Sequence, residues 1–229
     1  MQAWLESWFP DVMASPDRFF KSIGETLLMT GWAGSLMLVI GLALGVVLVI
    51  TRPHGVLENR WVYGILDKAI NLLRSIPFVI LIALLMNVTK FIMGTKIGVR
   101  GVIVPLVVGS APFFARQVET ALVGVPSGLV EAAKAMGTPT FKIIVKTLIP
   151  EAKPSLISGC TITVTTILGY TAMAGYVGGG GLGAIAINYG YYRYNTPVML
   201  VTVALMVVIV QLFQTIGSFI EKKTDKRIR

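Results

Sequence analysis

The chain has 229 residues, of which 55% are hydrophobic and only 14% charged, and its mean hydropathy is +0.77. A water-soluble domain rarely combines these values, and several apolar runs approach the roughly 20 residues that cross a bilayer as a helix. In a soluble protein the net charge of +9 would suggest a nucleic-acid partner, but in a membrane protein it indicates basic segments on the cytoplasmic side. Composition therefore predicts an all-α integral membrane protein in a lipid bilayer, with no nucleic-acid partner. The single cysteine, Cys160, excludes an intramolecular disulfide.

The first 21 residues are rich in Trp and Phe and carry acidic residues early, so they lack the basic start of a signal peptide. We expect residues 1–21 to form an interfacial segment on the lipid headgroups. The first membrane-spanning helix is predicted over residues 26–50. Gly41 and Gly45 form a GxxxG pattern within it, which either lets a neighbouring helix approach closely or is simply tolerated.

A second membrane helix is predicted over residues 65–88, and its first part is polar, with Asp67, Lys68 and Arg74. These groups are expected in the cytoplasmic interface or in a cavity lined by protein, because an arginine at the bilayer centre costs about 2.5–3.5 kcal/mol. Pro77 is expected to kink the helix and free a backbone carbonyl. Arg74 would then bond to freed carbonyls or to a neighbouring helix, or its side chain would extend to the membrane surface.

A third span is predicted over residues 99–114, short and interrupted, because it contains Pro105, Gly109 and Pro112. Broken helices at membrane depth are tolerated where protein or a water-filled cavity satisfies the backbone. This pattern favours a position beside other protein segments or a water-filled cavity.

The fourth span, predicted over residues 156–174, is rich in hydroxyl side chains. Thr161 and Thr165 share one face, which would line a passage for a polar solute or bond to carbonyls of the same helix. A flexible glycine-rich stretch is expected at residues 175–183. The fifth span is predicted over residues 198–220, before a basic tail.

The polar segment between the third and fourth spans reads as two short helices joined by a turn. Leu129, Ala132, Ala133 and Met136 have the spacing of one helical face, and Gly137 is a natural stop. The expected N-caps are Ser127 and Thr138, with Pro139 at the first position of the second helix and Pro150 closing it. The alanine-rich face suits either docking into a groove on another protein or lying on the membrane surface.

No sequence pattern for a catalytic, metal or nucleotide site is present. The glycine-rich stretch lacks the Lys-Ser/Thr ending of a phosphate-binding loop. A proton-coupled carrier needs acidic or histidine side chains inside its spans, and the predicted spans contain only Asp67, near one end. We therefore expect no enzymatic activity and no cofactor.

Residues 131–150 resemble the EAA loop of ABC importer permeases. The Glu of that motif is Glu131, the second Ala is Ala133 and the Gly is Gly137, whereas Thr147 departs mildly from the usual closing segment. In that family the loop is the coupling helix, which sits in a cleft of a cytoplasmic ATPase subunit. The resemblance thus implies an ATPase-coupling site at Glu131, Ala132, Ala133, Met136 and Gly137.

Most of the chain is similar to the permeases of bacterial methionine importers. The similar segments are Arg74-Ser75-Ile76-Pro77, Ala111-Pro112-Phe113, the EAA loop and residues 169–175. The resemblance implies the type I ABC importer permease fold, with five transmembrane helices and a cytoplasmic coupling-helix loop. Its domains would be the segment 1–21, a transmembrane domain at 22–220 with the EAA loop at 126–150, and a tail at 221–229.

The resemblance also implies the partners: a second copy of the chain, two ATP-binding cassette subunits and an extracytoplasmic methionine-binding protein. The expected function is import of L- and D-methionine by alternating access in the bacterial inner membrane. The open alternatives are a permease for another polar amino acid and, in a different class, a passive channel subunit.

A pathway and gate are expected at Met173, Tyr170, Thr161, Thr165 and Arg74. Methionine is flexible and apolar, so two copies of Met173 across a dimer axis would close a passage, although methionine is also a common gap-filler between helices. With the N-terminus outside and the C-terminus in the cytoplasm, 14 basic residues lie inside and 6 outside. This count favours that orientation. Lys90, Lys96 and Arg100 do not fit the rule, because the orientation places all three on the outer side.

Overall fold

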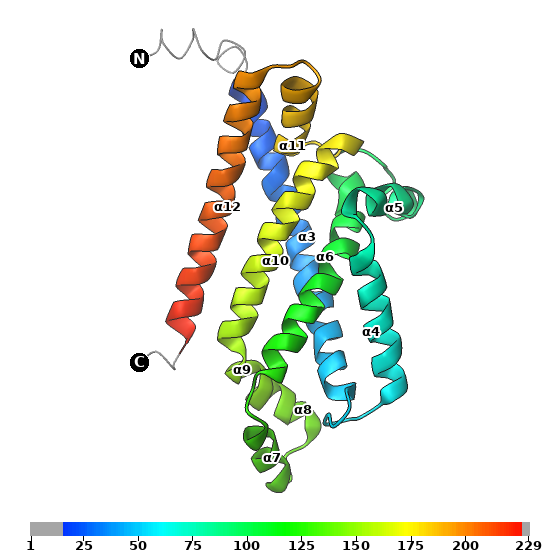
Figure 1. Ribbon diagram of the computed structural model, residues 1–229, viewed down its shortest axis with the longest axis vertical. Coiled ribbons are helices and arrows are strands. Elements are labelled where there is room, and N and C mark those ends of the chain that lie inside the picture. The colour runs from blue at the N-terminus through cyan, green and yellow to red at the C-terminus, as the bar shows by residue number, and fades with distance from the viewer. Residues whose placement is uncertain (1–15, 226–229) are drawn as a thin grey trace. The chain divides into compact units, whose positions relative to one another are not determined.

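The computed structural model describes residues 16–225, and this part of the chain is almost entirely helical (Figure 1). Among the described residues, four helices are long and apolar enough to cross a membrane: α3 (Pro16–Thr51), α6 (Gly98–Val123), α10 (Lys153–Ala174, extended by a 3₁₀ turn to Val177) and α12 (Thr196–Thr224). A fifth span results when the bent pair α4 (Arg60–Ser75) and α5 (Phe78–Met93) counts as one. The predicted all-α membrane fold is confirmed for the described residues, while most of the segment 1–21 lies outside them.

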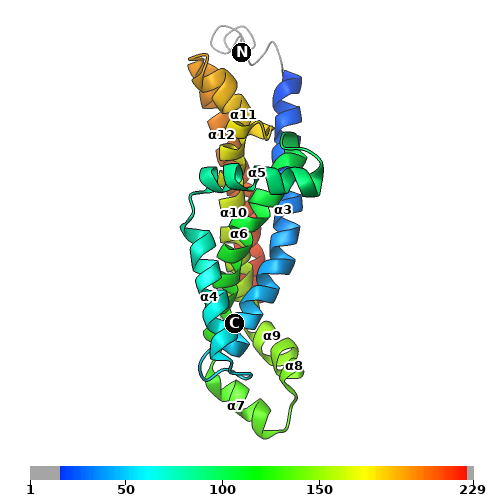
Figure 2. The same cartoon turned by 90° about the vertical axis from the view of Figure 1, so that its right-hand side faces the viewer.

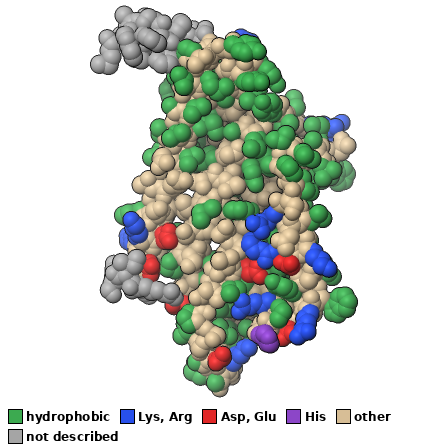
Figure 3. All heavy atoms as spheres, viewed as in Figure 1, with side chains coloured by type: hydrophobic (Ala, Val, Ile, Leu, Met, Phe, Trp, Pro, Cys, Tyr) green, Lys and Arg blue, Asp and Glu red, His purple; other side chains and the backbone are tan. Residues whose placement is uncertain are grey.

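The chain divides into two compact units, and each long helix contributes residues to both. Unit 1 contains Met1–Ser35, Pro77–Val107 and Val164–Phe213, and unit 2 contains Leu36–Ile76, Val108–Thr163 and Gln214–Arg229. On the face drawn in Figure 3, acidic side chains lie over elements of unit 2, whereas hydrophobic side chains cover most of unit 1.

The predicted second span, residues 65–88, is not one kinked helix. The structure ends α4 at Ser75, places Ile76 in an extended conformation and starts α5 at Phe78. Proline disfavours the helical conformation at the preceding residue and has no N–H to donate, and here Ile76 is extended and a new helix begins after Pro77. The helix α4 also begins earlier than predicted, because Asn59 caps it by accepting from the backbone N–H groups of Trp61 and Val62.

The predicted interruption of the third span is wrong. Helix α6 runs without a break through Pro105, Gly109 and Pro112 and ends at Val123. In an apolar environment the free ends of a broken helix cost more than the single donor lost at each proline, so a continuous helix is favoured. The first span is also longer than predicted, starting at Pro16 rather than Thr26.

In unit 2, α3 and α6 pack closely through the GxxxG pattern. A Cβ atom added at Gly41 would lie 2.8 Å from Cδ1 of Phe114, and one added at Gly45 would lie 2.5 Å from Cβ of Val118. These glycines therefore create the space for the neighbouring helix, as one of the two readings predicted. Beside this contact, Leu48 and Ala115 form an apolar cluster with Ile70 of α4.

In unit 1, the glycine-rich stretch leads into the short helix α11 (Gly181–Ile185) and a π-helical segment, η3 (Ala186–Tyr191). The buried Leu182 packs with Leu168 of α10 and Ile209 of α12. The stretch is thus part of the packed interior of unit 1 and not the free loop that its composition suggested.

Candidate functional site

The predicted coupling segment forms a helical hairpin in unit 2. It consists of α7 (Ser127–Ala135), a turn, and a second helical arm made of α8 (Thr140–Ile143), the π-helical η1 (Ile144–Leu148) and α9 (Ile149–Glu151). Figure 2 shows the two arms joined by the turn. The predicted helix-turn-helix order is therefore present, with different ends.

The predicted caps Ser127 and Thr138 are wrong. The N-cap positions are occupied by Pro126 and Pro139, and neither cap makes a side-chain hydrogen bond. Both prolines are extended, with ψ of 129° and 148°, so each helix starts at the residue after its proline. Pro150 was expected to close the second arm, and it lies in the last turn of that arm, which ends one residue later at Glu151.

Gly137 makes the turn between the arms. Its φ is +70°, in the left-handed region, and its N–H donates to the carbonyl of Lys134 at 2.9 Å. The next N–H, of Thr138, donates to the carbonyl of Ala133 at 3.1 Å, which satisfies another free carbonyl of α7. The predicted role of Gly137 as a helix stop agrees with this geometry.

One part of the apolar face predicted for α7 is buried in the protein, and the other part is exposed. Ala133 is buried within unit 2, because the second arm folds back over α7 and buries Ile143 and Leu148. Leu129 and Met136 instead remain 43% and 76% exposed, and Ala132 is exposed as well. Phe141 of the second arm is 74% exposed, so the hairpin presents large apolar side chains that no described residue covers.

A cavity of about 380 Å³ lies beside α7 and is lined by Glu131 and Lys134 together with residues of the loop after α3, including Arg52 and His54. Within the described residues, Glu131 and Lys134 do not form an ion pair with each other. The site therefore holds one unpaired carboxylate and two cations, Arg52 and Lys134, near exposed apolar groups.

The loop after α3 has its own fixed structure. The backbone N–H of His54, whose φ is +63°, donates to Oε2 of Glu58 at 3.1 Å. This bond, with the hydrogen bond from Arg60, lowers the pKa of the Glu58 carboxyl group. Glu58 thus remains ionised and holds the loop that lines the cavity.

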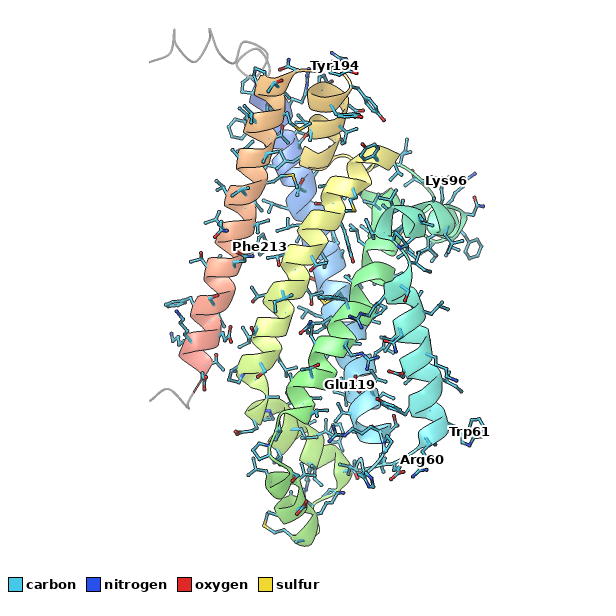
Figure 4. All side chains as sticks on the ribbon, in the orientation of Figure 1. Arg60, Trp61, Lys96, Glu119, Tyr194 and Phe213 are labelled. Atoms are coloured by element: carbon cyan, nitrogen blue, oxygen red, sulfur yellow. The ribbon has the colours of Figure 1, made fainter. Side chains whose placement is uncertain are left out.

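A charged network that the sequence did not reveal connects α4 to α6 in unit 2. Arg116 donates to Oδ1 of Asp67 at 2.6 Å and to Oε2 of Glu119 at 2.5 Å. The hydroxyl of Tyr63 donates to Glu119 at 3.3 Å, and Asn71 bonds to both Asp67 and Arg116. Figure 4 labels Glu119, which α6 carries on the side that bonds to α4. One guanidinium group therefore holds two carboxylates between two helices.

The expectation that the spans contain only one acid is wrong. Glu119 lies inside α6 and Glu25 lies inside α3. Both were missed because the predicted spans ended at residue 114 and began at residue 26, just short of each carboxylate. The acids are held by hydrogen bonds, Glu119 from Tyr63 and Arg116 and Glu25 from a backbone N–H.

The guanidinium group of Arg74 does not bond to the backbone carbonyls near Pro77. Its Cζ atom lies 5.7 Å from the centroid of the Phe113 ring on α6, within the range of a cation–π contact. The structure thus supports the second possibility considered for Arg74, contact with a neighbouring helix.

The predicted gate residues Tyr170 and Met173 lie at the end of α10 in unit 1. The ring of Tyr170 stacks on Phe78 of α5, with centroids 4.1 Å apart and planes 7° from parallel. Met173 is 44% exposed, so its side chain is not enclosed by the described residues. Tyr170 is therefore fixed by the start of α5, while Met173 is free to contact another molecule.

The two predicted pathway threonines have different surroundings. Thr161, in unit 2, donates to the carbonyl of Ile157 at 2.9 Å and lies against α12, where a Cβ atom at Gly217 would come within 2.1 Å of its hydroxyl. Thr161 therefore packs between helices. Thr165, in unit 1, is half-buried on the next turn of α10.

Residues 37–229 match the family model of the "Binding-protein-dependent transport system inner membrane component". The "Probable D-methionine transport system permease protein MetI" of Vibrio cholerae is 44% identical over 97% of this chain and 98% of its own length. The "Methionine import system permease protein MetP" of Bacillus subtilis is 43% identical over 97% of this chain and 99% of its own.

A solved structure described as "Inward facing conformations of the MetNI methionine ABC transporter" superposes with a TM-score of 0.91 at 44% identity, covering 93% of this chain and 99% of that one. An amino acid ABC transporter structure superposes with a TM-score of 0.78 over 94% of this chain, but at 18% identity it shows only that the fold is shared. A match of this extent to the family model, together with such identity along nearly the whole length, places the chain in the family of binding-protein-dependent transport system inner membrane components.

Proposed function

We propose that this chain is the permease subunit of an ATP-driven importer that translocates methionine, with a soluble binding protein delivering the substrate. The observation that carries the proposal is the near full-length identity of 44% and 43% to two permeases named for methionine transport. Both comparisons cover 97% of this chain, so they include the predicted pathway residues as well as the coupling hairpin.

In the proposed assembly, two copies of the chain form the membrane part and each binds one ATPase subunit through the hairpin of α7 and α8. The exposed Leu129, Met136 and Phe141 support this, because large apolar side chains at the end of a polar hairpin favour a protein partner. The unpaired Glu131 would add a polar contact at the rim. The coupling residues are then Glu131, Ala132, Met136 and Gly137, with Ala133 holding the hairpin together from inside.

The proposed orientation places the hairpin and the C-terminus in the cytoplasm and the N-terminus outside, as the count of basic residues favours. ATP binding and hydrolysis in the partner would move the hairpin, and alternating access would follow. Met173 with Tyr170 would form the outer gate, because Met173 is flexible, apolar and partly exposed beside a fixed aromatic ring.

The proposal is tested by reconstituting the permease in liposomes with an ATPase subunit and a binding protein from the same organism. ATP-dependent accumulation of methionine, saturable and competed by unlabelled methionine but not by glutamine or histidine, is the expected result. Uptake of another amino acid in preference to methionine would show that this other amino acid is the substrate. Flux of solute without ATP would favour the passive channel instead.

A further inference from the structure

The start of helix α11 is held by two side chains that lie 156 positions earlier in the sequence. The N–H of Gly181 donates to Oε2 of Glu25 at 2.7 Å, and the N–H of Leu182 donates to Oγ1 of Thr26 at 2.9 Å. Thr26 and Leu182 are almost fully buried, and both pairs belong to unit 1. These bonds satisfy two N–H groups that the start of a helix leaves without an internal partner.

The glycines around this contact leave room for it. Gly180 and Gly181 have φ of +85° and +73°, which side chains rarely allow. A Cβ atom at Gly180 would lie 2.7 Å from the Glu25 carboxylate, and one at Gly181 would lie 2.6 Å from the Thr26 hydroxyl. The glycines are thus needed for the close approach of α3, and they do not act here as free hinges.

The anchored turn of α11 presses directly on the segment that carries Met173. A Cβ atom at Gly183 would lie 2.3 Å from the carbonyl oxygen of Ala172, and one at Gly175 would lie 2.3 Å from the carbonyl carbon of Gly183. The two backbones are therefore in direct contact on both sides of Met173. In addition, the N–H of Gly179 donates to the carbonyl of Ala174 at 2.9 Å.

We infer that Glu25 is a positioning residue for Met173: by holding the first turn of α11, its carboxylate fixes the end of α10 and sets where the Met173 side chain lies. The inference rests on the proposed function only in treating Met173 as the gate. The placement of residue 173 by Glu25 is a property of unit 1 alone.

The acceptor oxygen, and not the negative charge, carries this role. Lys21 is the one described cation paired with Glu25, at 4.0 Å, and its side chain is 78% exposed, so this ion pair contributes little. Glu25→Gln keeps an oxygen that can accept from Gly181, whereas Glu25→Ala removes it. Gln should therefore preserve the placement of Met173, and Ala should lose it.

The test measures how fast a cysteine at position 173 reacts. Met173→Cys is placed in a permease with Cys160→Ala, purified in nanodiscs, and treated with a bulky water-soluble maleimide. A second cysteine, Thr95→Cys, reports on a half-buried turn of the same unit. Each is combined with Glu25→Ala, Glu25→Gln, Lys21→Ala or Thr26→Val.

Leaving the N–H of Gly181 without its acceptor should shift the local opening by about tenfold, so Glu25→Ala should raise labelling at 173 by about that factor. Glu25→Gln and Lys21→Ala should stay within about twofold of the parent, and Thr26→Val should follow Glu25→Ala in direction. Labelling at position 95 should not change.

Equal labelling at 173 in the Ala, Gln and parent proteins would overturn the inference. An equal rise at 173 and 95 would also overturn it, because Glu25 would then support the fold of the unit in general. The assay contains no methionine, ATP or ATPase, so failure of methionine uptake leaves its result unaffected and bears only on the proposed function.

Discussion

Among single residues, Arg116 lies at the centre of the charged network in the described part of unit 2. Its guanidinium group, 23% exposed, is shared between Asp67 of α4 and Glu119 of its own helix. Removing a buried partner from such a network leaves an uncompensated charge, and this costs more than the pair itself contributes. The network therefore makes the α4–α6 contact intolerant of change at its centre.

Arg116→Ala should lower the free energy of unfolding by about 2–3 kcal/mol, less than for a fully buried pair because the network is partly exposed. The matched control is Arg60→Ala, which breaks the exposed pair with Glu58 and should cost under about 1 kcal/mol. Thermal unfolding of the purified variants compares the two. Equal losses would mean that the network gives no special stability.

Gly137→Ala should uncouple ATP hydrolysis from uptake. The space around Gly137 is open, so the penalty is the left-handed backbone alone, about 1–2 kcal/mol for a residue with a side chain. The native turn would then be populated roughly 5- to 30-fold less relative to alternatives. ATPase activity and methionine uptake are measured together in liposomes.

Gly128→Ala is the control for this change. Gly128 also has open space around it, and it lies within α7 without a positive φ, so alanine there should be neutral or stabilising by about 0.5–1 kcal/mol. If ATP hydrolysis and uptake remain as tightly coupled in Gly137→Ala as in Gly128→Ala, the turn has no part in coupling.

Among the elements, α3 and α6 depend on each other through glycine. The prolines in α6 suggested a broken span, but the helix continues, and its residues Ala111 to Val118 lie against Gly41 and Gly45. Close backbone approach supplies the packing that a membrane helix cannot obtain from the hydrophobic effect. A side chain at either glycine would separate the helices.

Gly45→Ala should destabilise the permease by about 1–3 kcal/mol, because the new Cβ would overlap Val118 and the carbonyl of Ala115. Gly34→Ala, in the same helix with nothing within 4 Å, should be neutral or stabilising by up to about 1 kcal/mol. Unfolding in detergent, followed by circular dichroism, distinguishes them. A stable Gly45→Ala protein would show that α3 and α6 can separate without cost.

At the scale of the whole molecule, the first prediction concerns the proposed gate. Met173→Ala should let small solutes leak through liposomes without ATP, because alanine leaves the proposed closure incomplete. Ile162→Ala, at a similarly exposed position of the same helix, should not leak. If liposomes with Met173→Ala do not leak and substrate selectivity is unchanged, Met173 is a packing residue. Thr165 then becomes the next candidate for the gate.

A second prediction at this scale concerns the ATPase contact. A cysteine at position 131 should crosslink to the ATPase subunit, because Glu131 lines an open cavity on the proposed docking hairpin. A cysteine at Tyr194, which is 90% exposed and placed outside by the proposed orientation, should not. Crosslinks from 131 to lipid alone would contradict the docking assignment.

The sequence alone determined the membrane class, the apolar spans apart from the division of the second one at Pro77, and the hairpin with its turn at Gly137. These follow from signals within about 20 neighbouring residues: apolar length, helical spacing and a glycine at a helix end. It also indicated the GxxxG packing, since the pattern lies within one helix. Local signals misplaced the caps beside Pro126 and Pro139, because proline geometry outweighed the side-chain preference there.

Only the tertiary structure decided which distant groups meet. Asp67 and Arg116 are 49 positions apart, and Glu25 and Gly181 are 156 apart, so no spacing rule could pair them. The continuity of α6, the inward-facing Ala133 and the docked glycine stretch depend on the same cause, since each is set by the elements packed against it. A carboxylate removed from water costs free energy unless a donor meets it, and only the folded chain brings the donor and the carboxylate together.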